Sequence, residues 1–93
     1  MSKALESAQI QNELKHLDGW SVEDGKLTKK FTLSDFREAM AFMVRIAFEA
    51  EEQAHHPEIF NVYKEVRIQL ATHDAGGKIT NKDIELAKRI DAI

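Results

Sequence analysis

Apolar residues in the first third of the chain recur first at helical and then at strand-like intervals. Residues 2–16 carry leucine, alanine and isoleucine among polar side chains, which predicts a weakly amphipathic helix that Gly19 could end as a left-handed cap. The segments 20–22 and 26–33 favour strands, and the Asp-Gly pair within residues 23–25 is a strong hairpin signal. The chain is therefore predicted to begin with a helix and a β-hairpin.

A longer apolar pattern with the period of a helix follows the hairpin. Ser34 and Asp35 are both good N-cap residues, and the helix is expected to run from there to about Ala54. Pro57 disfavours helical geometry at the residue before it, so the helix must stop at about His55. One broad sector is apolar and is expected to face the core; it holds Phe36, Ala39, Met40, Phe42, Met43, Val44, Ile46, Ala47 and Ala50.

Two side chains of this helix break its pattern. Phe48 falls among charged residues, where it is either a lone exposed aromatic or part of a subunit contact. Glu51 falls inside the apolar sector, between Met40 and Val44, where an unpaired buried carboxylate would be costly. Either the end of the helix points Glu51 outward, or the carboxylate is held near a functional pocket.

The second half of the chain repeats the order strand, strand, helix. Residues 59–62 and 66–72 are predicted strands joined by a short turn, and His73 lies on the polar face of the second if that strand extends. Residues 76–77, both glycine, mark a flexible turn, and Thr80 opens the last helix. The predicted element order is αββαββα, which is an α+β arrangement.

Composition narrows the class of protein. The 93 residues suffice for one modest core, so residues 1–93 are treated as a single domain. A net charge of −3 provides no basic field for direct nucleic acid binding. The absence of cysteine excludes disulfides, a thiolate nucleophile and cysteine-containing metal sites. The polar N-terminus and the lack of a long apolar run predict a cytoplasmic protein that does not associate with membranes.

Candidate chemistry gathers between residues 51 and 83. His55, His56 and His73 lie close to the acids Glu51 and Asp83 in sequence, and histidine is the side chain whose unperturbed pKa lies nearest neutrality, so proton transfer is indicated. Singly, each has an ordinary explanation: His73 could be a polar strand-end residue and Asp83 a helix-capping acid. Adjacent histidines project in different directions and make a poor metal clamp. Motifs of nucleophilic catalysis are absent, which leaves acid–base work on a bound substrate.

The spacing of these residues resembles the signature of the pterin-4a-carbinolamine dehydratases, a family whose animal members double as a dimerisation cofactor of a homeodomain transcription factor. The matching run reads Glu51-x3-His55-His56-Pro57-x5-Tyr63-x9-His73-x9-Asp83. Gly19 and Trp20 match a further pair typical of the family, and the likeness is least clear over residues 1–16. The resemblance implies a four-stranded antiparallel sheet with three helices on one face, consistent with the order αββαββα.

The resemblance also implies an activity. The family eliminates water from 4a-hydroxytetrahydropterin, which aromatic amino acid hydroxylases leave behind, to give quinonoid dihydropterin in tetrahydrobiopterin recycling. No metal and no cofactor is expected. The partners implied are the pterin substrate, further copies of the chain in a homodimer or homotetramer, and functional coupling to a hydroxylase. Phe48 is a candidate contact in such an oligomer.

Roles for single residues follow from the matching positions. His55 and His73 are expected to be the acid–base pair, with His56 chiefly binding and orienting the substrate; the sequence does not assign acid and base between the two. Glu51 and Asp83 would support the histidines by selecting imidazole tautomers and raising basicity, or would contact the polar edges of the pterin.

Other features keep alternatives open. Trp20 would either help wall the pocket or close the first hairpin as a core residue. Lys82 stands where some relatives have arginine, and it lacks the planar fork for a bidentate contact. Two other functions remain to be compared with the dehydratase: a non-catalytic interaction or transcription-coactivator protein on the same fold, and a metal-binding module that uses the histidines and acids.

Overall fold

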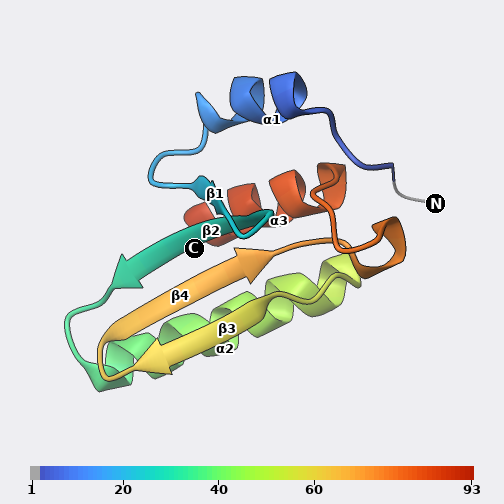
Figure 1. Ribbon diagram of the computed structural model, residues 1–93. Helices are drawn as coiled ribbons and strands as arrows, with labels where there is room; N and C mark the ends of the chain where they lie inside the picture. The colour runs from blue at the N-terminus through green and yellow to red at the C-terminus, as the bar shows by residue number, and fades with distance from the viewer. Residues whose placement is uncertain (1–2) are drawn as a thin grey trace.

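The computed structural model describes residues 3–93 and confirms the predicted order of helices and strands (Figure 1). A short 3-10 helix before the last helix is an element that the sequence pattern does not predict. The elements are α1 (Ser7–Leu14), β1 (Ser21–Glu23), β2 (Lys26–Thr32), α2 (Phe36–Gln53), β3 (Glu58–Val62), β4 (Glu65–Leu70), η1 (His73–Ala75) and α3 (Asn81–Asp91). The strands form one antiparallel sheet in the order β1-β2-β4-β3, so β2 and β4 are central.

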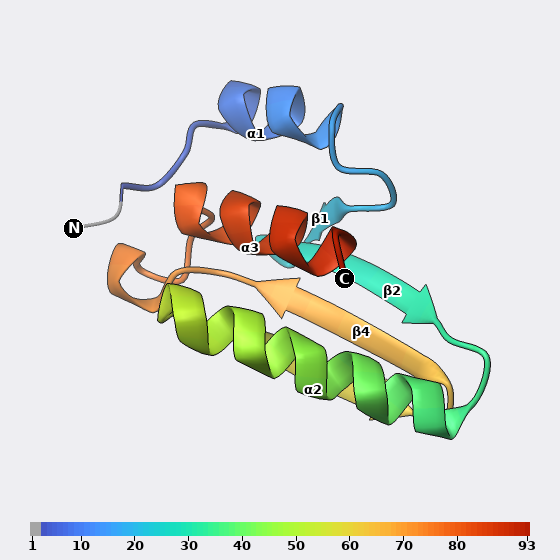
Figure 2. The same cartoon turned by 180° about the vertical axis from the view of Figure 1, so that it is seen from behind.

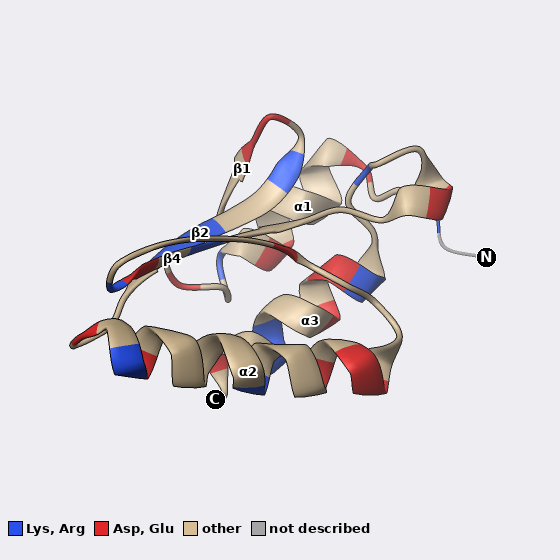
Figure 3. Cartoon of the chain, turned by 90° about the horizontal axis from the view of Figure 1, so that it is seen from below, with Lys and Arg blue, Asp and Glu red and all other residues tan. Residues whose placement is uncertain are grey.

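One face of the sheet carries the core. Val66, Ile68 and Leu70 alternate along β4 and are fully buried, and Leu27 of β2 lies opposite Leu70. Each such side chain contributes roughly 1.5–3 kcal/mol of burial free energy. Figure 3 shows α2 and α3 on the same side of the sheet, and α1 lies beside α3 (Figure 2). The core therefore lies between the central strands β2 and β4 and the helices α2 and α3.

The predicted first hairpin is confirmed. Its two-residue turn uses Asp24 and Gly25 at φ 54° and φ 75°, the left-handed conformation that a tight hairpin turn requires. The second hairpin turns at Tyr63, also at positive φ, where a bulky non-glycine residue is uncommon. The first turn sets the register of β1 against β2, and the second sets that of β3 against β4.

The second helix begins and ends as its sequence predicts. Asp35 is the N-cap and accepts a hydrogen bond from the backbone N–H of Glu38 at 2.9 Å. Ala54 takes the left-handed conformation at φ 55° and ends the helix one residue before His55. This cap turns the chain out of α2 directly into the two adjacent histidines.

The apolar sector of α2 is wider than the face that it buries. Ala39, Ile46 and Ala50 are buried, whereas a stripe along the neighbouring side remains open to solvent. This exposed stripe consists of Phe36, Met40, Val44 and Phe48. The expectation that the whole sector faces the core is wrong, because a helix lying on a sheet contacts it along one side only.

No helix within residues 3–93 is long and apolar enough to cross a membrane.

The first helix is shorter than its pattern predicts. The predicted segment 2–16 starts at a residue outside the described range, and α1 covers only Ser7–Leu14. Glu6 caps the helix, and the N–H of Leu5 donates to the carbonyl of Ile79 at 2.9 Å, which holds the preceding residues out of helical geometry. Gly19 has φ 82° but lies in the following turn rather than at the cap.

The last predicted strand also ends early. β4 stops at Leu70, after which the N–H of Thr72 donates to the carbonyl of Lys78 at 2.9 Å in an isolated bridge. The carbonyl of Thr72 accepts from two later amides, so the backbone turns into η1. His73 therefore opens a 3-10 turn instead of extending the polar face of the strand.

Candidate functional site

The three histidines from residues 55 to 73 line one pocket. It has a volume of about 320 Å³ and is lined by residues from the end of α2, from η1 and from the start of α3. The end of α2 and η1 lie on the right in Figure 1. We call it the histidine pocket; its lining residues are Ala54, His55, His56, Ala71, Thr72, His73, Asp74 and Lys82. The structure therefore brings together three of the predicted site residues that the sequence separates into two segments.

His55 is held by a buried carboxylate. Its Nε2 lies 2.5 Å from Oδ1 of Asp83, with His55 8% exposed and Asp83 0% exposed. The backbone N–H of His55 donates to the carbonyl of Ala50 at 3.0 Å, which fixes the ring at the end of α2. A short contact between a histidine and a carboxylate away from water positions the imidazole and selects its tautomer.

Asp83 caps α3 and supports His55 at the same time. Its Oδ2 accepts from the backbone N–H of Thr80 and from Oγ1 of Thr72, both at 2.9 Å, while Oδ1 faces His55. The structure therefore confirms Asp83 as a helix-capping acid and places it against His55, whereas its support of catalysis stays a prediction. An unpaired buried carboxylate would be costly, and here both oxygens have partners.

Glu51 and His56 form a second contact, on the surface. Oε1 of Glu51 lies 2.6 Å from Nε2 of His56, and the two side chains are 78% and 66% exposed. Glu51 points outward because its side of α2 faces solvent together with Met40 and Val44. It does not line the histidine pocket, and water and salt screen a contact this exposed.

His73 reaches the pocket from η1. Its side chain is exposed and makes no hydrogen bond to another side chain within residues 3–93. Asp74, beside it, also lines the pocket and is exposed. The pocket thus combines a buried histidine, His55, with an exposed one, His73, an arrangement suited to two separate proton transfers.

Trp20 lies in the core and not in the histidine pocket. It is 6% exposed, its ring meets Phe31 edge-on at 6.1 Å, and its Nε1 donates to Oδ2 of Asp91 at 2.9 Å. Asp91 ends α3 whereas Asp83 is in its first turn, so the length of the helix separates Trp20 from His55. Of the two alternatives for Trp20, this placement agrees with a core residue and not with a wall of the histidine pocket.

Sequence reasoning missed the role of Thr72. It is 2% exposed and joins Asp83 to the end of β4, and nothing in the local sequence predicts this contact across eleven positions. Thr80 was visible as a helix cap, because it stands three residues before Asp83 in a capping box. Lys82, noted in the sequence only as a departure from arginine, lines the pocket as well.

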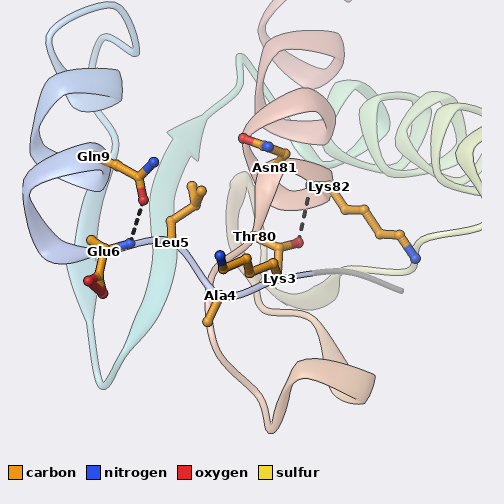
Figure 4. A pocket seen from close by; sticks show the side chains of 8 residues that line it. All are labelled: Lys3, Ala4, Leu5, Glu6, Gln9, Thr80, Asn81 and Lys82. Carbon is orange, nitrogen blue, oxygen red and sulfur yellow. Dashed lines mark hydrogen bonds between the residues drawn. The ribbon is translucent and has the colours of Figure 1, made fainter.

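A larger pocket lies between the segment that leads into α1 and the start of α3. It has a volume of about 630 Å³ and is lined by residues 3–6, Gln9, Thr80, Asn81 and Lys82 (Figure 4). None of its lining side chains is a histidine, and its one acid, Glu6, belongs to the cap of α1. Volume alone therefore does not make it the candidate site. Within residues 3–93 no group of three or more His, Asp or Glu side chains is arranged to hold a metal ion.

Comparison with known proteins points to one family. Residues 3–93 match the family described as "Pterin 4 alpha carbinolamine dehydratase". A protein of Opitutus terrae named "Putative pterin-4-alpha-carbinolamine dehydratase" is 55% identical over 93 residues, which are 100% of this chain and 96% of the relative. A protein of Prochlorococcus marinus with the same name is 50% identical, over 99% of this chain and 95% of the relative.

Two solved structures share the fold. A "transcriptional coactivator/pterin dehydratase" from Brucella melitensis superposes with a TM-score of 0.90 at 38% identity, covering 96% of each chain. A "pterin dehydratase-like protein" described as a RuBisCO assembly factor in the alpha-carboxysome has a TM-score of 0.63 at 26% identity, covering 78% of this chain and 83% of its own. The sheet and helices are therefore common to proteins with different printed roles.

Proposed function

Because the chain belongs to the pterin 4-alpha-carbinolamine dehydratase family, we propose that it eliminates water from a 4a-hydroxytetrahydropterin to give quinonoid dihydropterin. The observation that carries the proposal is the histidine pocket, in which side chains from two segments meet and one of them, His55, rests on a buried carboxylate. The volume of about 320 Å³ lies at the lower end of the range for small-ligand sites, roughly 300–1,000 Å³.

The reaction needs two proton transfers. The bond between C4a and the hydroxyl oxygen breaks, and the oxygen leaves as water after receiving a proton from an acid. The proton on N5 passes to a base, and the electron pair of the broken N–H bond forms the new double bond between N5 and C4a. Both steps suit imidazole at neutral pH, and neither requires a redox partner.

We assign His55 and His73 to these transfers and His56 to binding and orienting the pterin. His55 is buried and fixed, so it suits a transfer at a defined ring atom. His73 and His56 are exposed, so they can approach a substrate as it enters. The two catalytic histidines exchange the roles of acid and base for opposite stereoisomers at C4a.

The remaining parts of the proposal concern the surroundings of the enzyme. We expect a cytoplasmic protein that works without metal or cofactor beside an aromatic amino acid hydroxylase, because that reaction generates the substrate. We also expect a homodimer or homotetramer, which would cover the exposed stripe on α2. A non-catalytic interaction protein on this fold is not favoured, because it does not account for three histidines from two segments lining one pocket.

A turnover assay tests the function. 4a-Hydroxytetrahydropterin is generated by a hydroxylase, and its absorbance is followed with and without the protein, because the substrate also dehydrates spontaneously. We expect the wild-type protein to accelerate the decay and to remain active after treatment with a chelator. Replacing both His55 and His73 with alanine should abolish the acceleration.

The matched control is His16→Ala. His16 is exposed, lies near the end of α1 and does not line the histidine pocket, so its loss should leave turnover unchanged. Circular dichroism should show that both variants keep the fold. A folded double variant with full activity would contradict the proposal, as would a wild-type rate equal to the spontaneous one.

A further inference from the structure

A chain of buried hydrogen bonds runs behind Asp83. The backbone N–H of Lys82 donates to Oγ1 of Thr80 at 3.2 Å, as Figure 4 shows, and Oγ1 of Thr80 lies 2.6 Å from Oγ1 of Thr72. Thr72 then reaches Oδ2 of Asp83 at 2.9 Å. The two threonines are 2% and 1% exposed, so water does not compete for these groups.

The protons of this chain can point in one direction only. A hydroxyl has one proton, and an ionised carboxylate accepts but does not donate, so Thr72 must donate to Asp83. With its proton used, Thr72 can only accept from Thr80, and Thr80 must donate to it. The amide of Lys82 supplies the donor that the oxygen of Thr80 still needs.

This direction extends to His55. Oδ2 of Asp83 already accepts from Thr72 and from the N–H of Thr80, which leaves Oδ1 for Nε2 of the histidine. With Asp83 taken as an ionised carboxylate, Oδ1 can only accept, so Nε2 of His55 carries the proton in this arrangement. In the neutral ring, Nδ1 is then the nitrogen with a free electron pair.

Nδ1 is also the nitrogen that a ligand can reach. Nδ1 has no hydrogen-bond partner within residues 3–93. If it were fully enclosed, it would be a buried side-chain atom without a partner, but in that range the only such atoms belong to Gln53 and Arg89, so Nδ1 is accessible. His55 lines the histidine pocket, so the part of its ring that Asp83 does not cover faces the space for the substrate.

We propose that Thr72 is a positioning residue: its hydroxyl, oriented by Thr80, holds Asp83 so that His55 keeps its proton on Nε2 and presents Nδ1 to the substrate. The expected effect of Thr72 on turnover rests on the proposed function. The expected tautomer of His55 is independent of that function. The chemistry implied is one proton transfer at Nδ1 of His55 per turnover, with the proton on Nε2 remaining in place.

Two variants of Thr72 separate its hydroxyl from its shape. Thr72→Ser keeps the hydroxyl and loses a methyl group, whereas Thr72→Val keeps the shape and loses the hydroxyl. Nitrogen-15 NMR of the neutral histidines reports which ring nitrogen of His55 carries the proton, with His55→Gln used to assign its signals. Steady-state kinetics on the same proteins give kcat and KM.

We expect wild type and Thr72→Ser to show the proton of His55 on Nε2. Thr72→Val should show a mixture of the two tautomers and a kcat lower by roughly 10- to 100-fold, the usual cost of losing a group that orients a histidine in metal sites. KM should change by less than about threefold, because Thr72 orients His55 without being needed to hold the pterin. Restoration of kcat by serine would show that the hydroxyl, and not the packing, matters.

Several results would overturn the proposal. The proton of wild-type His55 on Nδ1 would refute it whether or not any variant folds. Equal loss of kcat in the serine and valine variants would reduce Thr72 to a packing role, and an unchanged tautomer and kcat in Thr72→Val would remove its role altogether. The wild type could also prove inactive while Thr72→Val still disturbs the Nε2–H tautomer of His55. That result would refute the proposed function and support the positioning of His55.

Discussion

Replacing Asp83 with asparagine should separate the chemistry of His55 from the stability of the fold. The amide has the shape of the carboxylate, and its oxygen can still accept from Thr72 and from the N–H of Thr80. Its NH2 group then faces Nε2 of His55, where Oδ1 of the aspartate stood. Nε2 must now accept, so the proton of the neutral imidazole moves to Nδ1 and the nitrogen facing the substrate can no longer act as a base.

The expected loss of stability follows from the three hydrogen bonds of Asp83. Bonds to a charged group contribute about 1.5–3 kcal/mol each and neutral ones about 0.5–1.5 kcal/mol. Removal of a buried charge offsets part of that difference, so we expect Asp83→Asn to lower the free energy of unfolding by about 1–2 kcal/mol. Asp83→Ala leaves Nε2 of His55, the hydroxyl of Thr72 and the backbone N–H of Thr80 without an acceptor. It should lower the free energy of unfolding by about 3–5 kcal/mol.

These energies set what each assay should show. A loss of 1 kcal/mol lowers the melting temperature of a domain of this size by roughly 4–8 °C, so Asp83→Asn should remain folded at 25 °C. Its kcat should fall by about 100-fold or more, since a positioned acid or base contributes on the order of 10²–10⁴-fold. Thermal unfolding, steady-state turnover and nitrogen-15 NMR of His55 give the three readouts.

Asp74→Asn is the matched control. Asp74 has the same carboxylate but is exposed and makes no side-chain hydrogen bond within residues 3–93, so its amide should leave the free energy of unfolding unchanged. The reasoning would be refuted if Asp83→Asn kept the proton of His55 on Nε2 and kept kcat within about threefold of wild type.

Three further predictions address other residues. Trp20→Phe removes the hydrogen bond to Asp91 but keeps most of the ring, so it should lower the free energy of unfolding by about 1–2 kcal/mol in denaturant titration; an unchanged stability, or a lower kcat, would contradict its core role. Glu51→Gln should change kcat/KM by less than about threefold in the turnover assay, because its contact with His56 is exposed; a much larger loss would show that the pair is catalytic. Phe48→Glu should reduce the molar mass measured by analytical ultracentrifugation, because Phe48 is 70% exposed in the stripe on α2; a wild type that sediments as a monomer would refute this.

Much of the fold is encoded over a few neighbouring residues. Asp24 with Gly25, Asp35 before its helix, and Thr80 three residues before Asp83 each satisfy the backbone groups of their own segment. Such signals act at short range, and the structure places the corresponding turn and helix starts where the sequence predicts them.

The departures arise where distant segments compete for the same groups. Leu5 could extend the first helix, but its N–H donates to Ile79 instead. His73 could extend a strand, but the bridge between Thr72 and Lys78 turns the chain first. For α2, periodicity shows which residues are apolar but not which side meets the sheet, so the exposure of Phe36, Met40 and Val44 could not be predicted.

By itself, the sequence determined the order of the elements, the residue types available for proton transfer and the family to which their spacing belongs. Only the tertiary structure decided that His55 rests on Asp83, that Glu51 stays outside the pocket and that Trp20 lies in the core. It also revealed Thr72 behind the carboxylate. The physical reason is that spacing records position along the chain, whereas a buried hydrogen bond depends on which distant groups are enclosed together and deprived of water.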